Sequence, residues 1–134
     1  ESRSLGADCI LLIMAALTLN EAIILEQEAK NFGMDVLVET HTKEEIEMAN
    51  KLETVLVGIN NRNLKTMEVD INNTLKLKSF INTDKIIVAE SGLKDNSDLK
   101  LLKENGIQNF LIGESLMKET DLTFATKKIL GLIN

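Results

Sequence analysis

Short apolar runs alternate with longer amphipathic segments along the whole chain. The short runs are rich in β-branched residues and cover residues 9–14, 36–38, 55–59, 86–89 and 110–112. Uncharged runs of this length are typical of strands that are buried on both faces of a parallel sheet. Successive runs begin about every 20–31 residues. The pattern therefore predicts five βα units in an α/β fold with a parallel sheet.

The segments between these runs carry helix signals. Thr18 and Glu21 form a capping-box pair ahead of an amphipathic helix, which we expect Gly33 to end in the left-handed conformation. Thr42 and Glu45 repeat the capping pattern and predict a helix to about residue 52. The remaining helices are expected at about 71–81, 97–105 and 122–132.

Two architectures accommodate five βα units: an open doubly wound sheet, and part of an eight-stranded barrel. Hydrophobic periodicity does not choose between them. The chain has no proline and no low-complexity linker, so we expect one domain over residues 1–134. Residues 1–5 have the pattern of the last turn of a helix, which Gly6 stops. We therefore expect that a segment preceding Glu1 has been removed or left out.

Composition excludes several classes of protein. A net charge of −6 argues against a general nucleic-acid binder. No apolar run approaches the roughly 20 residues of a membrane helix. The single cysteine, Cys9, excludes an intrachain disulfide framework and a cysteine-rich metal site. Because Cys9 lies inside an apolar run, we expect a small core residue, a use of cysteine that suits a cytoplasmic protein.

The carboxyl ends of the predicted strands are polar. Glu39 and Glu90 each follow an apolar strand directly, and Asn60 ends the strand between them. Carboxyl ends of parallel strands meet at one rim, so the two carboxylates could do acid–base work or position a catalytic lysine. The alternative for either one is a water-facing or loop-capping residue. Two carboxylates in matching places favour function.

Glycines follow the last two strands. Gly92 and Gly113 would let the backbone approach a ligand closely, and a short helix starting near Ser115 would point free N–H groups at an anion. The alternative is a pair of ordinary turn glycines. His41 is the only histidine, so no metal cluster or triad is visible, and we expect it to make a loop-orienting hydrogen bond. Arg62 is either a carboxylate-binding residue or a solvated loop arginine.

Several strand-end motifs together resemble one family, indole-3-glycerol-phosphate synthase. The resemblance covers essentially the whole chain, and the most specific motifs are Gly-Ile-Asn-Asn-Arg at residues 58–62 and Leu-Ile-Gly-Glu-Ser-Leu-Met at residues 111–117. The supporting motifs are Gly6-Ala7-Asp8 with Leu11-Leu12-Ile13, Val38-Glu39-Thr40-His41 and Ala89-Glu90-Ser91-Gly92-Leu93. The resemblance implies an incomplete (β/α)₈ TIM barrel made of strands four to eight.

The resemblance also implies a reaction. The family converts 1-(2-carboxyphenylamino)-1-deoxyribulose 5-phosphate to indole-3-glycerol phosphate with loss of CO₂ and water, as a carboxy-lyase of tryptophan biosynthesis. No metal or organic cofactor is needed. Matching the motifs implies three catalytic residues, Glu39, Asn60 and Glu90. The implied binding residues are Arg62, Ser91, Leu11, Ile13 and Leu64 for the substrate, and Gly92, Gly113 and the backbone amide of Glu114 for its phosphate.

This chain departs from the family pattern in two ways. Glu114 stands where some members have serine, so its side chain would have to point away from the phosphate. The first three strands, which bring a glutamate and two lysines in the family, are absent, and no lysine lies at the end of an assigned strand. We therefore expect an inactive fragment whose two unpaired strand edges favour self-association. The alternatives are a non-catalytic half-barrel, or another phosphate-binding barrel such as phosphoribosylanthranilate isomerase or a tryptophan synthase α chain.

Overall fold

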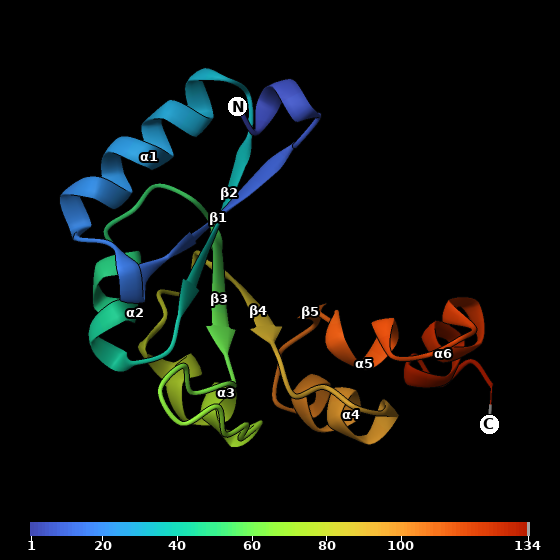
Figure 1. Cartoon of the computed structure of the whole chain (residues 1–134). Helices are drawn as coiled ribbons and strands as arrows, with labels where there is room; N and C mark the ends of the chain where they lie inside the picture. The colour runs from blue at the N-terminus through green and yellow to red at the C-terminus, as the bar shows by residue number, and fades with distance from the viewer. Residues whose placement is uncertain (134) are drawn as a thin grey trace.

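One parallel sheet organises the chain, as the computed structural model shows for residues 1–133 (Figure 1). The five strands lie side by side in the order of the sequence. Their bounds are β1 (Cys9–Ile13), β2 (Asp35–Thr40), β3 (Leu56–Asn60), β4 (Ile86–Glu90) and β5 (Asn109–Leu111). Every neighbouring pair is parallel. The predicted α/β class with five parallel βα units is confirmed, and this sheet is part of a barrel wall rather than a closed barrel.

Helices follow each strand. Their bounds are α1 (Leu19–Asn31), α2 (Lys43–Ala49), α3 (Asn72–Leu77), α4 (Asn96–Glu104), α5 (Glu114–Met117) and α6 (Leu122–Ile129), with 3₁₀ turns at Arg3–Leu5, Met14–Ala16 and Lys78–Phe80. Three helices are shorter than predicted. The second ends at Ala49 rather than near residue 52, the third gives way to a 3₁₀ turn after Leu77, and the last ends at Ile129. Past α2 and α6 the backbone continues in turns, with bonds such as that of the Leu52 amide to the Ala49 carbonyl, so only the regular α-helical pattern ends early.

The caps explain where α1 and α4 begin and end. Thr18 and Glu21 form the full reciprocal capping box that the sequence predicts. Gly33, at φ 66°, and Gly106, at φ 83°, supply the left-handed residues that follow α1 and α4. The second capping box is only half formed, because the Thr42 side chain accepts from the Glu45 amide while the Glu45 carboxylate bonds elsewhere.

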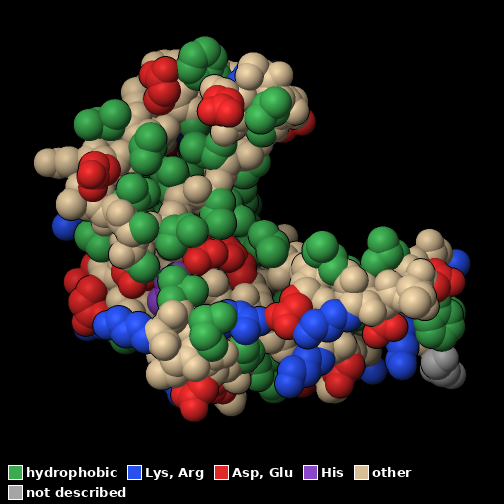
Figure 2. Space-filling model, viewed as in Figure 1, with side chains coloured by type: hydrophobic (Ala, Val, Ile, Leu, Met, Phe, Trp, Pro, Cys, Tyr) green, Lys and Arg blue, Asp and Glu red, His purple; other side chains and the backbone are tan. Residues whose placement is uncertain are grey.

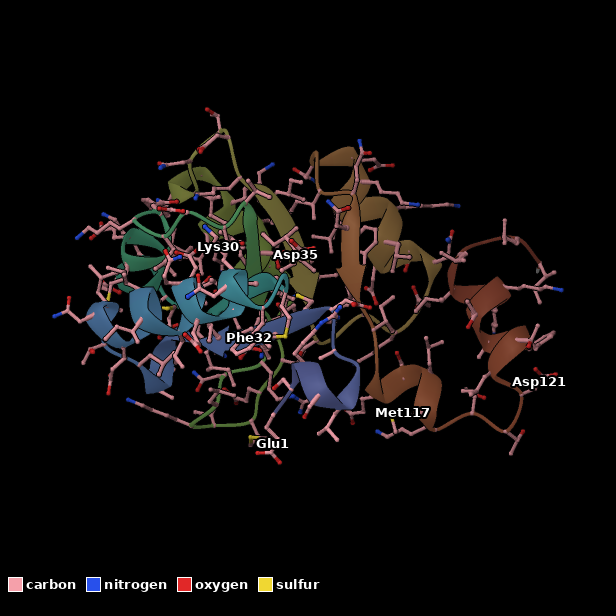
Figure 3. All side chains as sticks on the ribbon, turned by 90° about the horizontal axis from the view of Figure 1, so that it is seen from above. Glu1, Lys30, Phe32, Asp35, Met117 and Asp121 are labelled. Atoms are coloured by element: carbon pink, nitrogen blue, oxygen red, sulfur yellow. The ribbon has the colours of Figure 1, made fainter. Side chains whose placement is uncertain are left out.

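One face of the sheet is covered by helices. Residues facing α1 and α2 are fully buried, among them Val36 and Val38 of β2 and Val57 of β3. A second buried cluster, around Leu99 and Leu102 of α4, packs against the β4 side of the sheet. Figure 3, seen from above, shows α1 lying along the sheet, with Lys30 and Phe32 near Asp35 at the start of β2, and Met117 and Asp121 on the far side.

The other face of the sheet is concave and open. The strand register places Leu11, Leu37, Leu56 and Ile86 in one row across it. The outer members of this row are exposed, Leu11 by 45% and Ile86 by 43%. Figure 2 shows the hollow beside this green surface. The prediction of strands buried on both faces is therefore wrong for this face, because no layer of the described chain packs on it.

Cys9 lies on the same open face. We predicted a small core residue, and the structure shows an exposed free thiol instead. The reason is alternation along β1, where Ile10 and Leu12 point to the helices and leave Cys9 and Leu11 on the concave side. No helix in residues 1–133 is long and apolar enough to cross a membrane.

Candidate active site

Glu39, Gly58, Asn60 and Glu90 meet at the carboxyl rim of the concave face. Glu39 of β2 is level with Gly58 of β3, and Asn60 is level with Glu90 of β4. Residues level with one another in a parallel sheet point to the same face, and so do residues two apart on one strand. The hydrophobic runs set this register, and the polar residue that ends each run then lies at the rim.

Glu39 and Glu90 form a buried carboxyl pair, with 6% and 3% of their surfaces exposed. Burial, and then the hydrogen bonding and negative charge of the adjacent Glu39, together raise the pKa of Glu90 to about 8. At neutral pH Glu90 is therefore protonated and can share its proton with Glu39. Such a pair can act as acid or base, as we expected of these two residues.

Gly58 makes room for this pair. A Cβ atom at Gly58 would lie 1.8 Å from Oε1 of Glu90 and 3.6 Å from Cα of Glu39. The Glu90 carboxyl group thus lies across the bare backbone of β3. Sequence reasoning included Gly58 in the Gly-Ile-Asn-Asn-Arg motif without assigning it a role.

Asn60 orders the loop that follows β3. Its Oδ1 accepts from the Arg62 amide at 2.9 Å. The next residue, Asn61, donates from Nδ2 to the carbonyl of Ser91, and its Oδ1 accepts from the amide and hydroxyl of Thr74. These bonds join the loops after β3 and β4. Asn61 is 3% exposed, and its bonding is that of a structural link between loops.

His41 lies between two carboxylates. Its Nε2 is 3.2 Å from Oε1 of Glu39, and its Nδ1 is 3.2 Å from Oε2 of Glu45, which also accepts from the His41 amide at 2.7 Å. The predicted loop-orienting hydrogen bond is therefore present, made to Glu45, a residue that we had assigned only to a cap. In Figure 2 the single purple histidine lies beside acidic side chains near the middle of the face.

Two buried polar atoms of residues 1–133 have no hydrogen-bond partner, and both belong to this cluster. They are Nε2 of His41 and Oε1 of Glu90. Buried polar atoms are nearly always paired, so an unpaired one needs a specific reason. Both atoms belong to side chains that neighbour Glu39 at the carboxyl rim.

A cavity of about 570 Å³ lies at the loops that follow β4 and β5, and Ser91, the residue after Glu90, lines it. Every residue that we predicted for phosphate binding lines it, and so do two predicted substrate residues, Arg62 and Ser91. The further lining residues with polar side chains are Lys94, Ser115, Lys118 and Glu119. Sequence reasoning missed Lys94 and Lys118, because they lie several residues past the strand ends, where no pattern marks them.

The backbone at this cavity has unusual conformations. Gly92 has φ 76°, and a Cβ there would lie 2.3 Å from Cγ1 of Val69. Ser91, at φ 62°, adopts the left-handed region despite its side chain. Gly113 has open space around it, so a Cβ atom there would meet no neighbouring atom. α5 begins at Glu114, one residue before the predicted start.

Glu114 is one of the residues that line this cavity. Its carboxylate pairs with the Arg62 guanidinium and, at 2.6 Å, with Nζ of Lys118. Hydrogen bonding to Lys118, and the charges of Lys118 and Arg62, hold the pKa of Glu114 below its usual range. An acidic side chain therefore pairs with two cations that line the cavity, and the expectation that it points away from a bound phosphate stays a prediction.

A smaller cavity of about 420 Å³ lies on the other side of Arg62. Asn60, Leu64, His41 and Glu45 are among the residues that line it. Arg62 lines both cavities. The three apolar residues predicted to bind the substrate therefore lie in two places. Leu64 is in the loop after β3, whereas Leu11 and Ile13 are on β1. Within residues 1–133 no three His, Cys, Asp or Glu side chains form a group that could hold a metal ion.

These features define a class of protein: a parallel βα barrel segment with its polar site at the carboxyl ends of the strands. Solved structures share the fold. 3-Hexulose-6-phosphate synthase from Salmonella typhimurium superimposes with a TM-score of 0.78 at 12% identity over 97% of this chain and 63% of its own. A mandelate oxidase mutant superimposes with a TM-score of 0.67, also at 12% identity, over 98% of this chain and 46% of its own.

Sequence comparison identifies the family. The family model of indole-3-glycerol phosphate synthase matches residues 1–129, and the chain belongs to this family. The synthase of Azospirillum brasilense is 50% identical over 98% of this chain and 50% of its own length. The synthase of Magnetococcus marinus is 49% identical over 98% of this chain and 49% of its own. The chain spans about half the length of these curated relatives.

Proposed function

We propose that this chain supplies the carboxyl-terminal part of an indole-3-glycerol phosphate synthase active site. The reaction is ring closure of 1-(2-carboxyphenylamino)-1-deoxyribulose 5-phosphate, with loss of CO₂ and water, in tryptophan biosynthesis. The observation that carries the proposal is the buried Glu39–Glu90 pair, in which Oε1 of Glu90 has no hydrogen-bond partner. Ser91 and Gly92, which follow Glu90 directly, line the larger cavity. Membership of the family supports the assignment.

The carboxyl pair and Asn60 are the proposed catalytic groups. Glu39 assists the dehydration half of the reaction as an acid–base group, because Glu90 beside it is protonated at neutral pH and can exchange a proton with it. The free Oε1 of Glu90 accepts a hydrogen bond from an ammonium group, which fits the proposed task of holding the family's catalytic lysines. Asn60, on the same face, donates a hydrogen bond to the reacting region.

The larger cavity is the proposed phosphate site. Gly92 and Gly113 form bare backbone walls, and the amide of Glu114 lies in the first turn of α5, where helix N–H groups are unpaired. Ser91 lies beside Gly92 in the same wall. Lys94 and Lys118 add positive charge that suits a phosphate dianion.

The remaining substrate contacts follow from position. Arg62, which lines both cavities, is placed to bind the substrate carboxylate by its two-pronged guanidinium. Leu11 and Ile13 on the concave face, with Leu64 in the loop after β3, provide apolar surface for the anthranilate ring. No cofactor is required by this chemistry, and the partner is a small phosphorylated molecule rather than nucleic acid.

Complementation tests the proposal. The amino-terminal half of the Azospirillum brasilense relative is mixed or co-expressed with this chain, and formation of indole-3-glycerol phosphate is followed by its indole fluorescence. We expect no turnover from the 134 residues alone and measurable turnover from the pair. Glu39→Gln in the pair should reduce kcat by about 10²–10⁴-fold. Turnover by the chain alone would disprove its predicted inactivity, and a pair that folds without turnover would refute the assignment.

A second candidate is a half-barrel that binds phosphate or a partner chain without turnover. The exposed apolar row on the concave face favours it, since β1 and β5 are also open edges of the sheet. This candidate predicts self-association, which size-exclusion chromatography measures, and phosphate binding that persists in Glu39→Gln. Another phosphate-binding barrel activity, such as that of phosphoribosylanthranilate isomerase, would show as turnover of that substrate by the complemented pair.

A further inference from the structure

We propose that His41 is a positioning residue that holds the Glu39 carboxylate against Glu90. The use of this pair in catalysis rests on the proposed function, whereas the contact itself does not. His41 follows β2 directly, two residues after Glu39, so the strand and its first loop residue bring the imidazole back to the carboxylate. The ring thereby lies against the Glu39 carboxylate.

The geometry is that of a clamp. Each ring nitrogen faces one carboxylate at 3.2 Å, Nε2 facing Glu39 and Nδ1 facing Glu45. The three side chains are largely buried, with 10% of His41, 8% of Glu39 and 14% of Glu45 exposed. Nδ1 makes a hydrogen bond with Glu45, whereas Nε2 lies close to Glu39 without hydrogen-bond geometry. The largely buried ring has little freedom to turn away from Glu39, because water has little access to replace the Glu45 bond.

Glu45 is itself fixed. Its carboxylate accepts from the His41 amide at 2.7 Å, and its own amide donates to Oγ1 of Thr42 at the start of α2. The imidazole is therefore fixed to the first turn of α2, and a short loop connects that helix to β2. This arrangement also explains why the second capping box is incomplete, since the Glu45 carboxylate is engaged by His41.

Glu39 consequently lies between His41 and Glu90. Nε2 of His41 and Oε1 of Glu90 both lack a hydrogen-bond partner. The Glu39 carboxylate therefore has a neighbouring side chain on each side, and its hydrogen-bonding capacity is not filled. The other charged groups around the adjoining cavity are Arg62, Lys65, Glu68 and Asp70. If the ring is removed, Glu39 can rotate away from Glu90 and toward that cavity.

Two substitutions of His41 distinguish a side chain that positions Glu39 from one that only fills space. In His41→Gln the amide nitrogen reaches about as far as Nε2 and can still contact Glu39, whereas in His41→Asn it reaches only as far as Nδ1. The probe is the Glu90 carboxyl carbon, followed by NMR of the full 134-residue chain with ¹³C-labelled glutamate over a pH titration. Backbone shifts of the later part of α1, around Glu26 at the amino rim, report whether each variant is folded.

The wild-type chain should titrate Glu90 at about 8. In His41→Asn the pKa of Glu90 should fall below about 7, because the negative charge of Glu39 moves away. His41→Gln should restore most of the wild-type pKa. Glu45→Gln, which weakens the anchor and leaves the imidazole in place, should give a smaller fall in the same direction and serves if His41→Asn does not fold.

Equal Glu90 titration in all four proteins, or a rise in the pKa of Glu90 in His41→Asn, would overturn the positioning role. A rise would mean that the ring acts on Glu90 as a positive charge and does not hold Glu39. The measurement needs no turnover, so it stands apart from the complementation assay. If the pair turns over and the titrations are equal, only the role of His41 fails. If the titrations differ as expected and no turnover occurs, only the proposed function fails.

Discussion

Two buried glutamates at opposite rims of the sheet contrast sharply. Glu26 of α1 is 4% exposed at the amino rim, and Glu90 is 3% exposed at the carboxyl rim. The Glu26 carboxylate accepts from the amides of Glu53 at 3.1 Å and Thr54 at 2.5 Å, just before β3. Glu90 by contrast has one oxygen without a partner and a pKa raised to about 8.

The hydrogen bonds of a buried carboxylate indicate whether its role is structural or functional. The amino rim is saturated, since Thr54 also donates to Val36, and Lys85 donates to the carbonyls of Leu52 and Thr54. A carboxylate with its bonds complete holds a loop in place. An equally buried carboxyl group that has an oxygen without a hydrogen-bond partner is a candidate functional group. In parallel barrels, stability is concentrated at the amino rim and chemistry at the carboxyl rim.

Removing Glu26 should therefore cost the most stability. In Glu26→Ala the amides of Glu53 and Thr54 lose a charged acceptor, and the free energy of unfolding should fall by about 2–4 kcal/mol. Urea denaturation measures it. Glu90→Gln is the matched variant at the other rim, and it should raise stability at pH 7 by roughly 2 kcal/mol, since Glu90 must take up a proton to fold at that pH and glutamine need not. Equal losses in the free energy of unfolding in the two variants would contradict the proposed difference between the two rims.

The pH dependence of stability should come from the carboxyl rim. The folded chain keeps the proton on Glu90 up to about pH 8, whereas the unfolded chain releases it near pH 4.5. The native state therefore binds more protons between these values, so stability is greatest at the acidic end of this window and falls as pH rises through 8. The loss should be on the order of 3 kcal/mol in the wild type and absent in Glu90→Gln. Urea midpoints at a series of pH values test this, and an unchanged slope in Glu90→Gln would assign it to another group.

Gly58→Ala should strain the carboxyl rim alone. The new Cβ would overlap Oε1 of Glu90, which must move, and we expect a loss of about 1–3 kcal/mol in the free energy of unfolding. The control is the double variant Gly58→Ala, Glu90→Ala, in which the added methyl group meets an empty space. Recovery of most of the loss relative to Glu90→Ala alone would locate the strain at this contact. Equal losses in both backgrounds would place it elsewhere.

Glu114→Gln extends the comparison to an exposed carboxylate. Glu114 competes with any anion for Arg62 and Lys118 at the larger cavity. Because exposed ion pairs are weak, its removal should increase inorganic phosphate affinity only about two- to fivefold. Isothermal titration calorimetry measures this. Glu47→Gln, which alters an exposed pair with Lys43 on α2, should leave the affinity unchanged. A drop in affinity in Glu114→Gln would mean that the carboxylate organises the cations for binding.

Local chemistry made much of the architecture predictable. The capping residues of α1, the left-handed glycines and the apolar runs each act within a few residues, so their outcome can be read along the chain. The strand-end positions of Glu39, Asn60 and Glu90 followed from the same runs. Contacts such as that of Arg62 with Glu114, 52 residues apart, have no local signal and could not be predicted.

The amino-acid sequence by itself determined five βα units, their order and the polar residues that end the strands, because helix and strand periodicity are properties of neighbouring residues. Only the tertiary structure decided which strand face is open, leaving Cys9 and Leu11 exposed, and which of two equally buried glutamates is saturated. Burial and hydrogen-bond pairing depend on what the folded chain brings alongside each group, and a list of residues does not contain that information.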